Sequence, residues 1–180
     1  MSLTPEGVSL SGMRRFFPIV LLLPVLTAGA QAETAPLFPP VSAPVDFVQV
    51  DKTGRTLTLY GAGQPLRTYR DIQLGDAPVG HKRFQGDERT PEGRYVIDYR
   101  NPNSRYHLSL HISYPDARDR AHAQARGRSP GGDIFIHGQP NGFPGRIAGD
   151  WTDGCIALSN PEIEDMWTLV PDGTPIEILP

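Results

Sequence analysis

Cys155 is the only cysteine in the 180-residue chain, and its setting favours nucleophilic chemistry. A free thiol has a pKa of about 8.5, so it needs a nearby base to react well near neutral pH. His137 can be that base, because a neutral imidazole can take the thiol proton. The glycine-rich segment 138–154 between them is long enough to fold back and bring the two together. The alternatives are a small buried thiol and a core histidine bonded to the backbone.

The residues beside Cys155 could support an attack on a carbonyl carbon. Gly154 leaves room for a substrate backbone and permits unusual φ values. The backbone N–H groups around Asp153, Gly154 and Cys155 are candidates for an oxyanion hole. A carboxylate aimed at a thiol opposes its ionisation, so we expect the Asp153 side chain to point away. Thr152 is expected to hold the loop by a hydrogen bond from its side chain to the backbone.

Other side chains are weaker candidates for the site. Trp151 could stack on a substrate or anchor the loop, and anchoring is the favoured interpretation. His111 lies in a strand pattern, where it could line a substrate cleft or simply be half-exposed, with equal weight on each. His81 and His122 are interpreted as surface residues. No spacing of His, Cys and Asp residues matches a zinc site.

Composition limits the class of protein. The chain has 17 basic and 20 acidic side chains and no basic block, which argues against nucleic acid as a partner. Glycine and proline, at 19 each, favour many turns and short strands over a helical bundle. One domain plus a short leader fits this length.

The N-terminus resembles an export signal. Arg14 and Arg15 precede the apolar run Phe16 to Leu26, and small residues with A-x-A spacing follow. The run is too short for a stable membrane span, which needs about 20 residues. We therefore expect a signal peptide over residues 1–32 and a periplasmic protein, with an uncleaved interfacial anchor as the alternative. A lone thiol in an exported chain is buried, paired with another chain, or reactive.

The rest of the chain divides into a linker and one domain. Residues 33–44 are proline-rich and predict an extended linker, and the domain follows over residues 45–180. Residues 75–92 predict a loop. Strand patterns cover residues 45–51, 56–60, 66–74, 94–99, 107–113, 133–137 and 174–179. Helices are expected over residues 116–126 and 160–170.

Two local patterns refine these elements. Alternation over residues 107–113 places His107, Ser109 and His111 on one face of a strand, opposite an apolar face. Asn160 followed by proline predicts the N-cap of the second helix. Gly127 predicts a left-handed stop after the first helix.

The motif around the thiol resembles that of a known family. His137-Gly138, followed by the segment Trp151 to Ile156 (WTDGCI), is similar to the signature of YkuD-type L,D-transpeptidase catalytic domains. The turn at residues 90–93 and the stretch 106–115 resemble the family too, the latter its YafK-like branch. The resemblance covers residues 45–180. It implies a mostly β fold, a YkuD-like mixed β-sandwich with two short helices and a long catalytic loop.

The same resemblance implies a reaction. Cys155 would attack the carbonyl of diaminopimelate in a peptidoglycan stem peptide, forming a thioester that an amine or water resolves. His137 would be the base and then the acid, and Gly154 and Cys155 would supply oxyanion N–H groups. Gly138 belongs to the motif beside the base. No metal or cofactor is implied.

Two positions depart from the family pattern. Ala157 stands where many members carry an arginine able to bind a carboxylate, and Asp153 stands where many have histidine. The YafK-like branch also includes enzymes that cut the link between peptidoglycan and a bound lipoprotein. Three functions therefore remain open: a transpeptidase, a hydrolase of the same fold, and a non-catalytic wall-binding module. A thiol redox protein is disfavoured, because a Cys-x-x-Cys pair is absent from the sequence.

Overall fold

The computed structural model describes residues 36–180. The expected signal peptide at residues 1–32 lies outside this part of the chain. Residues 36–44 of the expected linker form neither helix nor strand. The domain that follows is built on β-structure, as predicted.

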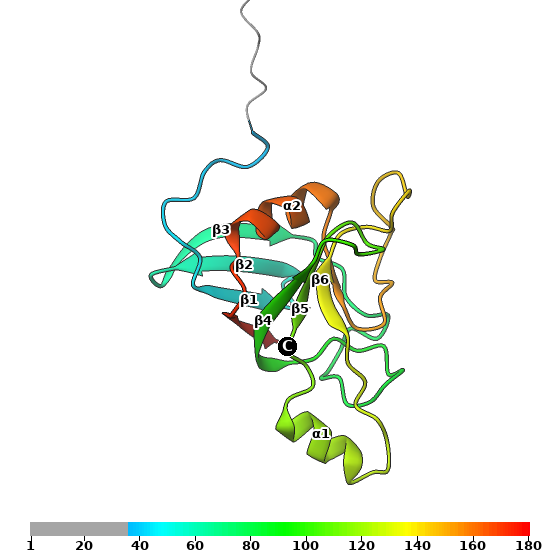
Figure 1. Cartoon of the computed structure of the whole chain (residues 1–180). Coiled ribbons are helices and arrows are strands. Elements are labelled where there is room, and N and C mark those ends of the chain that lie inside the picture. The colour runs from blue at the N-terminus through cyan, green and yellow to red at the C-terminus, as the bar shows by residue number, and fades with distance from the viewer. Residues whose placement is uncertain (1–35) are drawn as a thin grey trace, which may run out of the picture. The chain divides into compact units, whose positions relative to one another are not determined.

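Eight strands of the described chain form one mixed sheet in the order β3-β2-β1-β8-β4-β5-β6-β7 (Figure 1). The strands are β1 (Phe47–Asp51), β2 (Thr56–Gly61), β3 (Gln64–Arg70), β4 (Gly93–Asn101), β5 (Ser109–Ile112), β6 (Ile134–His137), β7 (Ile156–Ala157) and β8 (Thr174–Leu179). The pairs β1–β8 and β6–β7 are parallel, and the other neighbours are antiparallel. The sheet curls on itself, so one continuous sheet supplies both sides of the core.

The core follows from the alternation of apolar residues along these strands. In β1 and β2, every second side chain is buried, as expected for strands with one face covered. In β5, Leu110 and Ile112 are fully buried. Helix α2 (Asn160–Leu169) adds Ile163 and Met166 to the same core. The mostly β architecture with two short helices is therefore confirmed.

The predicted strand over residues 66–74 is too long. β3 ends at Arg70, because Asp71 takes a left-handed backbone with φ +56. The chain then crosses to the other end of the sheet. There Gln73 and Gly75 form isolated bridges with Ala157 and Thr152. This crossing places residues 72–75 beside the Gly-Cys motif.

His107 also departs from the predicted pattern. It lies before β5 with φ +65, and its ring contacts Glu164 of α2 at 2.6 Å. The prediction that it shares a strand face with His111 is wrong, because the left-handed backbone turns it out of the strand.

The start of α2 differs by one residue from the prediction. Ser159 is the N-cap, and the Glu162 carboxylate accepts hydrogen bonds from its N–H at 2.8 Å and its hydroxyl at 2.6 Å. Asn160 is therefore the first helical residue and not the cap. Its side-chain oxygen instead accepts the Gln139 N–H at 2.8 Å. This hydrogen bond attaches the beginning of the 138–154 loop to α2.

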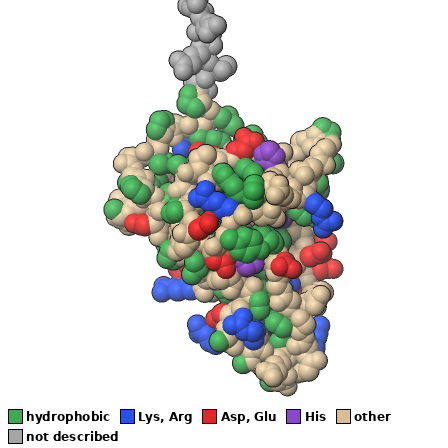
Figure 2. Space-filling view, in the orientation of Figure 1, with side chains coloured by type: hydrophobic (Ala, Val, Ile, Leu, Met, Phe, Trp, Pro, Cys, Tyr) green, Lys and Arg blue, Asp and Glu red, His purple; other side chains and the backbone are tan. Residues whose placement is uncertain are grey.

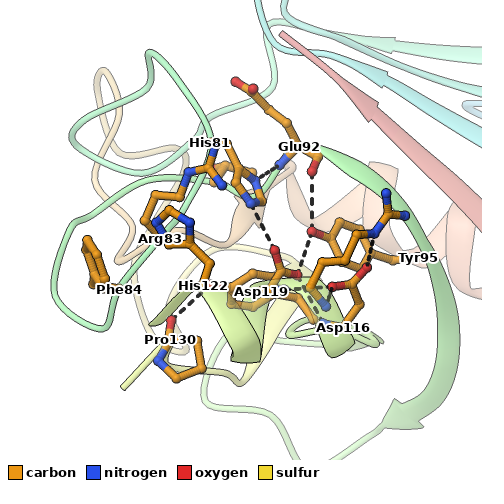
Figure 3. A network of polar contacts seen from close by, with 12 residues as sticks. His81, Arg83, Phe84, Glu92, Tyr95, Asp116, Asp119, His122 and Pro130 are labelled. Atoms are coloured by element: carbon orange, nitrogen blue, oxygen red, sulfur yellow. Dashed lines mark hydrogen bonds and ion pairs between the residues drawn. The ribbon is translucent and has the colours of Figure 1, made fainter. Parts of the chain in front are cut away.

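A buried polar network joins the 75–92 loop to helix α1 (Ala117–Gln124) and β4 (Figure 3). The Glu92 N–H donates to His81 Nδ1 at 2.8 Å, so Nε2 carries the proton and donates to Asp119 at 2.9 Å. The Tyr95 hydroxyl donates to the same carboxylate at 3.0 Å. The interpretation of His81 as a surface residue is therefore wrong. Gly127 has φ +62 after α1, as predicted.

Candidate active site

Strands β6 and β7 place His137 and Cys155 on the same side of the sheet. The two strands are parallel, with Ile136 opposite Ile156, and both isoleucines are fully buried in the core. Side chains alternate along a strand, so the neighbouring His137 and Cys155 face the other side. The Phe135 N–H donates to Cys155 Sγ at 3.4 Å, which fixes the thiol beside β6.

Both side chains open onto one cavity of about 1090 Å³. Trp151, Thr152 and Asp153 also line this cavity, so the structure brings together most of the predicted site. His111, Gly138 and Gly154 are not among its lining residues.

His137 is held as a neutral imidazole. Its side chain is buried, and Nδ1 donates to the Gly138 carbonyl at 2.7 Å, which leaves Nε2 as the proton acceptor. Tyr106 stacks on the imidazole with centroids 4.6 Å apart, and Trp151 packs edge-on at 5.5 Å. Burial lowers the His137 pKa to about 4, although the hydrogen bond to Gly138 opposes that shift. The ring is therefore uncharged at neutral pH.

Cys155 is a half-buried thiol that is also neutral at rest. Burial raises its pKa to about 11, and the charges of Asp153 and Asp133 act in the same direction. The Phe135 N–H and the Lys82 ammonium act in the opposite direction. The thiol donates to the Asp133 carbonyl at 3.6 Å. The thiol and the imidazole at this cavity are therefore both uncharged at rest, so the thiol must lose its proton before or as it reacts.

A tight turn presents Cys155 to the cavity. The Thr152 hydroxyl donates to the Cys155 carbonyl at 2.8 Å and accepts the Gly154 N–H at 3.2 Å. Thr152 thus holds the loop through its side chain. Gly154 has φ +120, and a Cβ there would overlap the backbone oxygen of Arg89. With the Gly154 N–H engaged, the Asp153 and Cys155 N–H groups are the donors of this turn that remain for an oxyanion.

Two buried glutamines, which the sequence did not single out, support the loop. Gln139 Nε2 donates to Gln73 Oε1 at 3.1 Å and to the Leu158 carbonyl at 2.7 Å. Gln73 in turn donates to the Ile147 carbonyl at 2.6 Å and accepts the Trp151 indole N–H at 3.2 Å. Trp151 is therefore anchored at its polar end while its ring packs on His137. The sequence signal that could have identified this support is the polar Gln73 between the apolar Ile72 and Leu74.

Lys82 and Tyr106 are two further lining residues that sequence reasoning did not place in the site. Lys82 is buried, and its ammonium donates to Asp87 at 3.1 Å and to the Asp153 carbonyl at 3.4 Å. It lies in a loop without periodicity, which left no pattern to identify it. Tyr106 begins the stretch that resembled the YafK-like branch, but its contact with His137 depends on the folded chain.

His111 lies on the outer side of β5, next to the cavity rather than in it. Its Nδ1 contacts Asp98 at 2.6 Å, and its ring stacks on Tyr99 with centroids 4.4 Å apart. Phe135 packs against the same imidazole at 4.9 Å.

Residues 36–180 hold neither a cluster of candidate metal ligands nor a helix that could span a membrane. In this part of the chain, three or more His, Cys, Asp or Glu side chains do not come together in a way that could hold a metal ion. The described helices are also too short or too polar to cross a membrane.

Comparison with known proteins identifies a family for this domain. Residues 46–178 match the family model of the L,D-transpeptidase catalytic domain. YafK of Escherichia coli K12, named as a candidate L,D-transpeptidase, is 31% identical over 129 residues, covering 69% of this chain and 46% of its own. YkuD of Bacillus licheniformis, named likewise, is 29% identical over 138 residues, covering 74% and 65%.

Solved structures show the same fold. The helical cell shape determining protein Pgp2 of Campylobacter jejuni superposes with a TM-score of 0.60 and 27% identity over 77% of this chain and 49% of that chain. Bd1075 of Bdellovibrio bacteriovorus gives 0.53 and 25% over 76% and 48%. The chain thus spans about half the length of YafK, Pgp2 and Bd1075.

Proposed function

Because this chain belongs to the L,D-transpeptidase catalytic domain family, we propose that it is a cysteine acyl-transfer enzyme that acts on peptidoglycan stem peptides. The observation that carries the proposal is the placement of His137, at the end of β6, and Cys155, directly before the adjacent parallel strand β7, at one cavity. The hydrogen bond from His137 Nδ1 to Gly138 supports it, because it leaves Nε2 to accept the thiol proton.

The neutral pair determines the order of events. As Cys155 Sγ attacks the diaminopimelate carbonyl, its proton passes to His137 Nε2, and the new oxyanion accepts the Cys155 N–H. The carbon–nitrogen bond then breaks, and His137 gives its proton to the leaving amine, which leaves a thioester. An amine or a water molecule then attacks the thioester, and His137 takes its proton. Sγ regains that proton, and the resting pair is restored.

Hydrolysis by water is the second candidate, and one observation favours it. Ala157, at the position where the family resemblance predicts an arginine, is fully buried and bridges to Gln73. Alanine at this position supplies no cation to bind the carboxylate of an acceptor peptide. A hydrolase of this kind would shorten stem peptides or release a lipoprotein bound to diaminopimelate.

We further propose that the enzyme works in the cell envelope after export to the periplasm. The apolar segment after Arg14 and Arg15 supports export. Pgp2 is a helical cell shape determining protein, and the likeness to it supports a role in remodelling the wall.

Purified sacculi test the proposal and separate its variants. Sacculi are incubated with the parent protein, Cys155→Ala and His137→Ala, and the products are mapped by mass spectrometry. We expect the parent to change the sacculi and both variants to lose at least about a thousandfold in rate. New cross-links between diaminopimelate residues would support transfer, and shortened stems or released lipoprotein would support hydrolysis. Unchanged sacculi that still bind the parent would contradict both and favour a wall-binding module.

A further inference from the structure

The aromatic rings of Tyr99, His111 and Phe135 form a row across β4, β5 and β6. Phe135 lines the cavity, whereas Tyr99 and His111 lie outside its lining. Tyr99 is paired in register with His111, and His111 with Phe135. Tyr99 and His111 stack with an interplanar angle of 19°, and Phe135 meets Tyr99 edge-on at 6.0 Å. Figure 2 shows hydrophobic side chains beside a histidine on the face over β4 and β5. We call these three residues the aromatic row.

The row leads directly to the nucleophile. Phe135 lines the cavity, and its backbone N–H donates to Cys155 Sγ at 3.4 Å. Neighbouring strands lie about 4.8 Å apart, so Tyr99 is about 14 Å from Cys155 along the row, and His111 is about 10 Å away. A ligand that occupied the cavity and continued outward over Phe135 would therefore reach these rings.

The outer end of the row is not part of the core. Tyr99 is 43% exposed, and the carboxylate of Asp98 beside it accepts a hydrogen bond from His111 Nδ1 at 2.6 Å. Asp133, at the inner end, lines the cavity. His111 covers one face of the Tyr99 ring, and the exposed part of Tyr99, with polar groups beside it, suits a ligand that has one apolar face and a rim of hydroxyl groups. A pyranose ring has this character.

We propose that the aromatic row binds a sugar of the glycan strand whose stem peptide occupies the cavity. This proposal rests on the proposed function. Three extended peptide residues span about 10 to 11 Å, which matches the distance from Cys155 to the outer half of the row. The carboxylates of Asp98 and Asp133 disfavour an anionic lipid surface, and three rings are too small a patch for a stable protein interface, which needs about 1,000 Å².

The kinetic test compares two substrates that differ only in the sugar. Parent, Tyr99→Ala and Val96→Ala are assayed with a stem tetrapeptide carrying its disaccharide and with the free tetrapeptide. Val96 is an exposed apolar residue of β4 outside the row, so it is the matched control. We expect Tyr99→Ala to lower kcat/KM about fivefold on the disaccharide substrate only, with Val96→Ala unchanged. An equal loss on both substrates, or no loss, would overturn the proposal.

A binding test separates failure of the row from failure of the proposed function. Peptide-free glycan strands are titrated into Cys155→Ala, with and without Tyr99→Ala, and followed by NMR. Shifts at the row that disappear with Tyr99→Ala support the row even if the parent converts neither substrate. Absence of binding overturns the row and leaves the proposed function standing. A change of oligomeric state with Tyr99→Ala in sedimentation would also overturn it, in favour of a second copy of the chain.

Discussion

At the scale of single residues, the site depends on how His137 and Cys155 are kept uncharged. Both are shifted in the direction that burial dictates, the base to a lower pKa and the thiol to a higher one. Tyr106 and Trp151 pack against the imidazole and shield it from solvent. Reactivity is therefore expected only when a substrate supplies the carbonyl that receives the sulfur.

The buried imidazole predicts a pH dependence of stability. Above about pH 6.5 the ring is neutral in both states. Between about 6.5 and about 4 the unfolded chain binds a proton that folded His137 does not, so the free energy of unfolding falls as the pH drops. The loss over this window is about 3 kcal/mol. His137→Gln should lose less stability between pH 7 and pH 4.5 in urea titrations. Parallel losses in both proteins would contradict the buried neutral base.

The thiol predicts a pH dependence of alkylation. With the Cys155 pKa raised to about 11, its reaction with iodoacetamide should keep rising through pH 9 and show no plateau near pH 7. A small model thiol, with a pKa of about 8.5, levels off earlier and is the reference. A plateau between pH 6 and pH 8 would instead indicate a standing thiolate–imidazolium pair.

The gathering of Cys155, His137, Trp151 and Thr152 at one cavity could be predicted from the sequence, whereas the positions of Lys82 and Gln73 could not. Cys155 and His137 stand out because few residue types are nucleophiles or bases. Each also belongs to a glycine motif, since Gly138 follows His137 and Gly154 precedes Cys155. Lys82 and Gln73 are far from the 137–155 segment in the sequence. They contact the site because the folded chain brings their loops beside it. Such contacts leave no periodic pattern.

At the scale of elements, the Gly154 turn is the most constrained part of the site. Gly154→Ala would force a left-handed φ on alanine and press Cβ against the Arg89 backbone oxygen, which cannot move as a side chain could. We expect it to lower the free energy of unfolding by more than about 2 kcal/mol. Gly149→Ala, in the same loop with φ +70 and open space at Cβ, is the control and should cost about 1 kcal/mol. Equal costs in thermal or urea unfolding would contradict this.

Most strands and both helices could be predicted, because their apolar periodicity is strong. The errors occurred where a single backbone conformation decided the outcome. Asp71 and His107 adopt left-handed φ values that their residue types do not require, so β3 stops early and His107 leaves its strand. At α2, Ser159 outcompetes Asn160 as the cap because Glu162 can reach it.

At the scale of the whole molecule, pairing between distant segments creates the site. β8, the last strand in the chain, lies between β1 and β4, and residues 73–75 bridge to the Gly-Cys segment. Local patterns predict strands but not such non-local neighbours, whose formation depends on the whole core. The resemblance to a family supplied the fold class, which strand patterns alone left as mostly β.

The central claim is that Cys155 carries the acyl group, and one measurement tests it most directly. The parent protein is mixed with a stem tetrapeptide, quenched in acid within milliseconds to seconds, and examined by intact-protein and peptide mass spectrometry. We predict a transient adduct of the acyl portion on the peptide containing Cys155, cleaved by hydroxylamine as a thioester is. Cys155→Ala should show neither the adduct nor turnover. Turnover without an adduct on Cys155, or turnover by Cys155→Ala at the parent rate, would contradict the account.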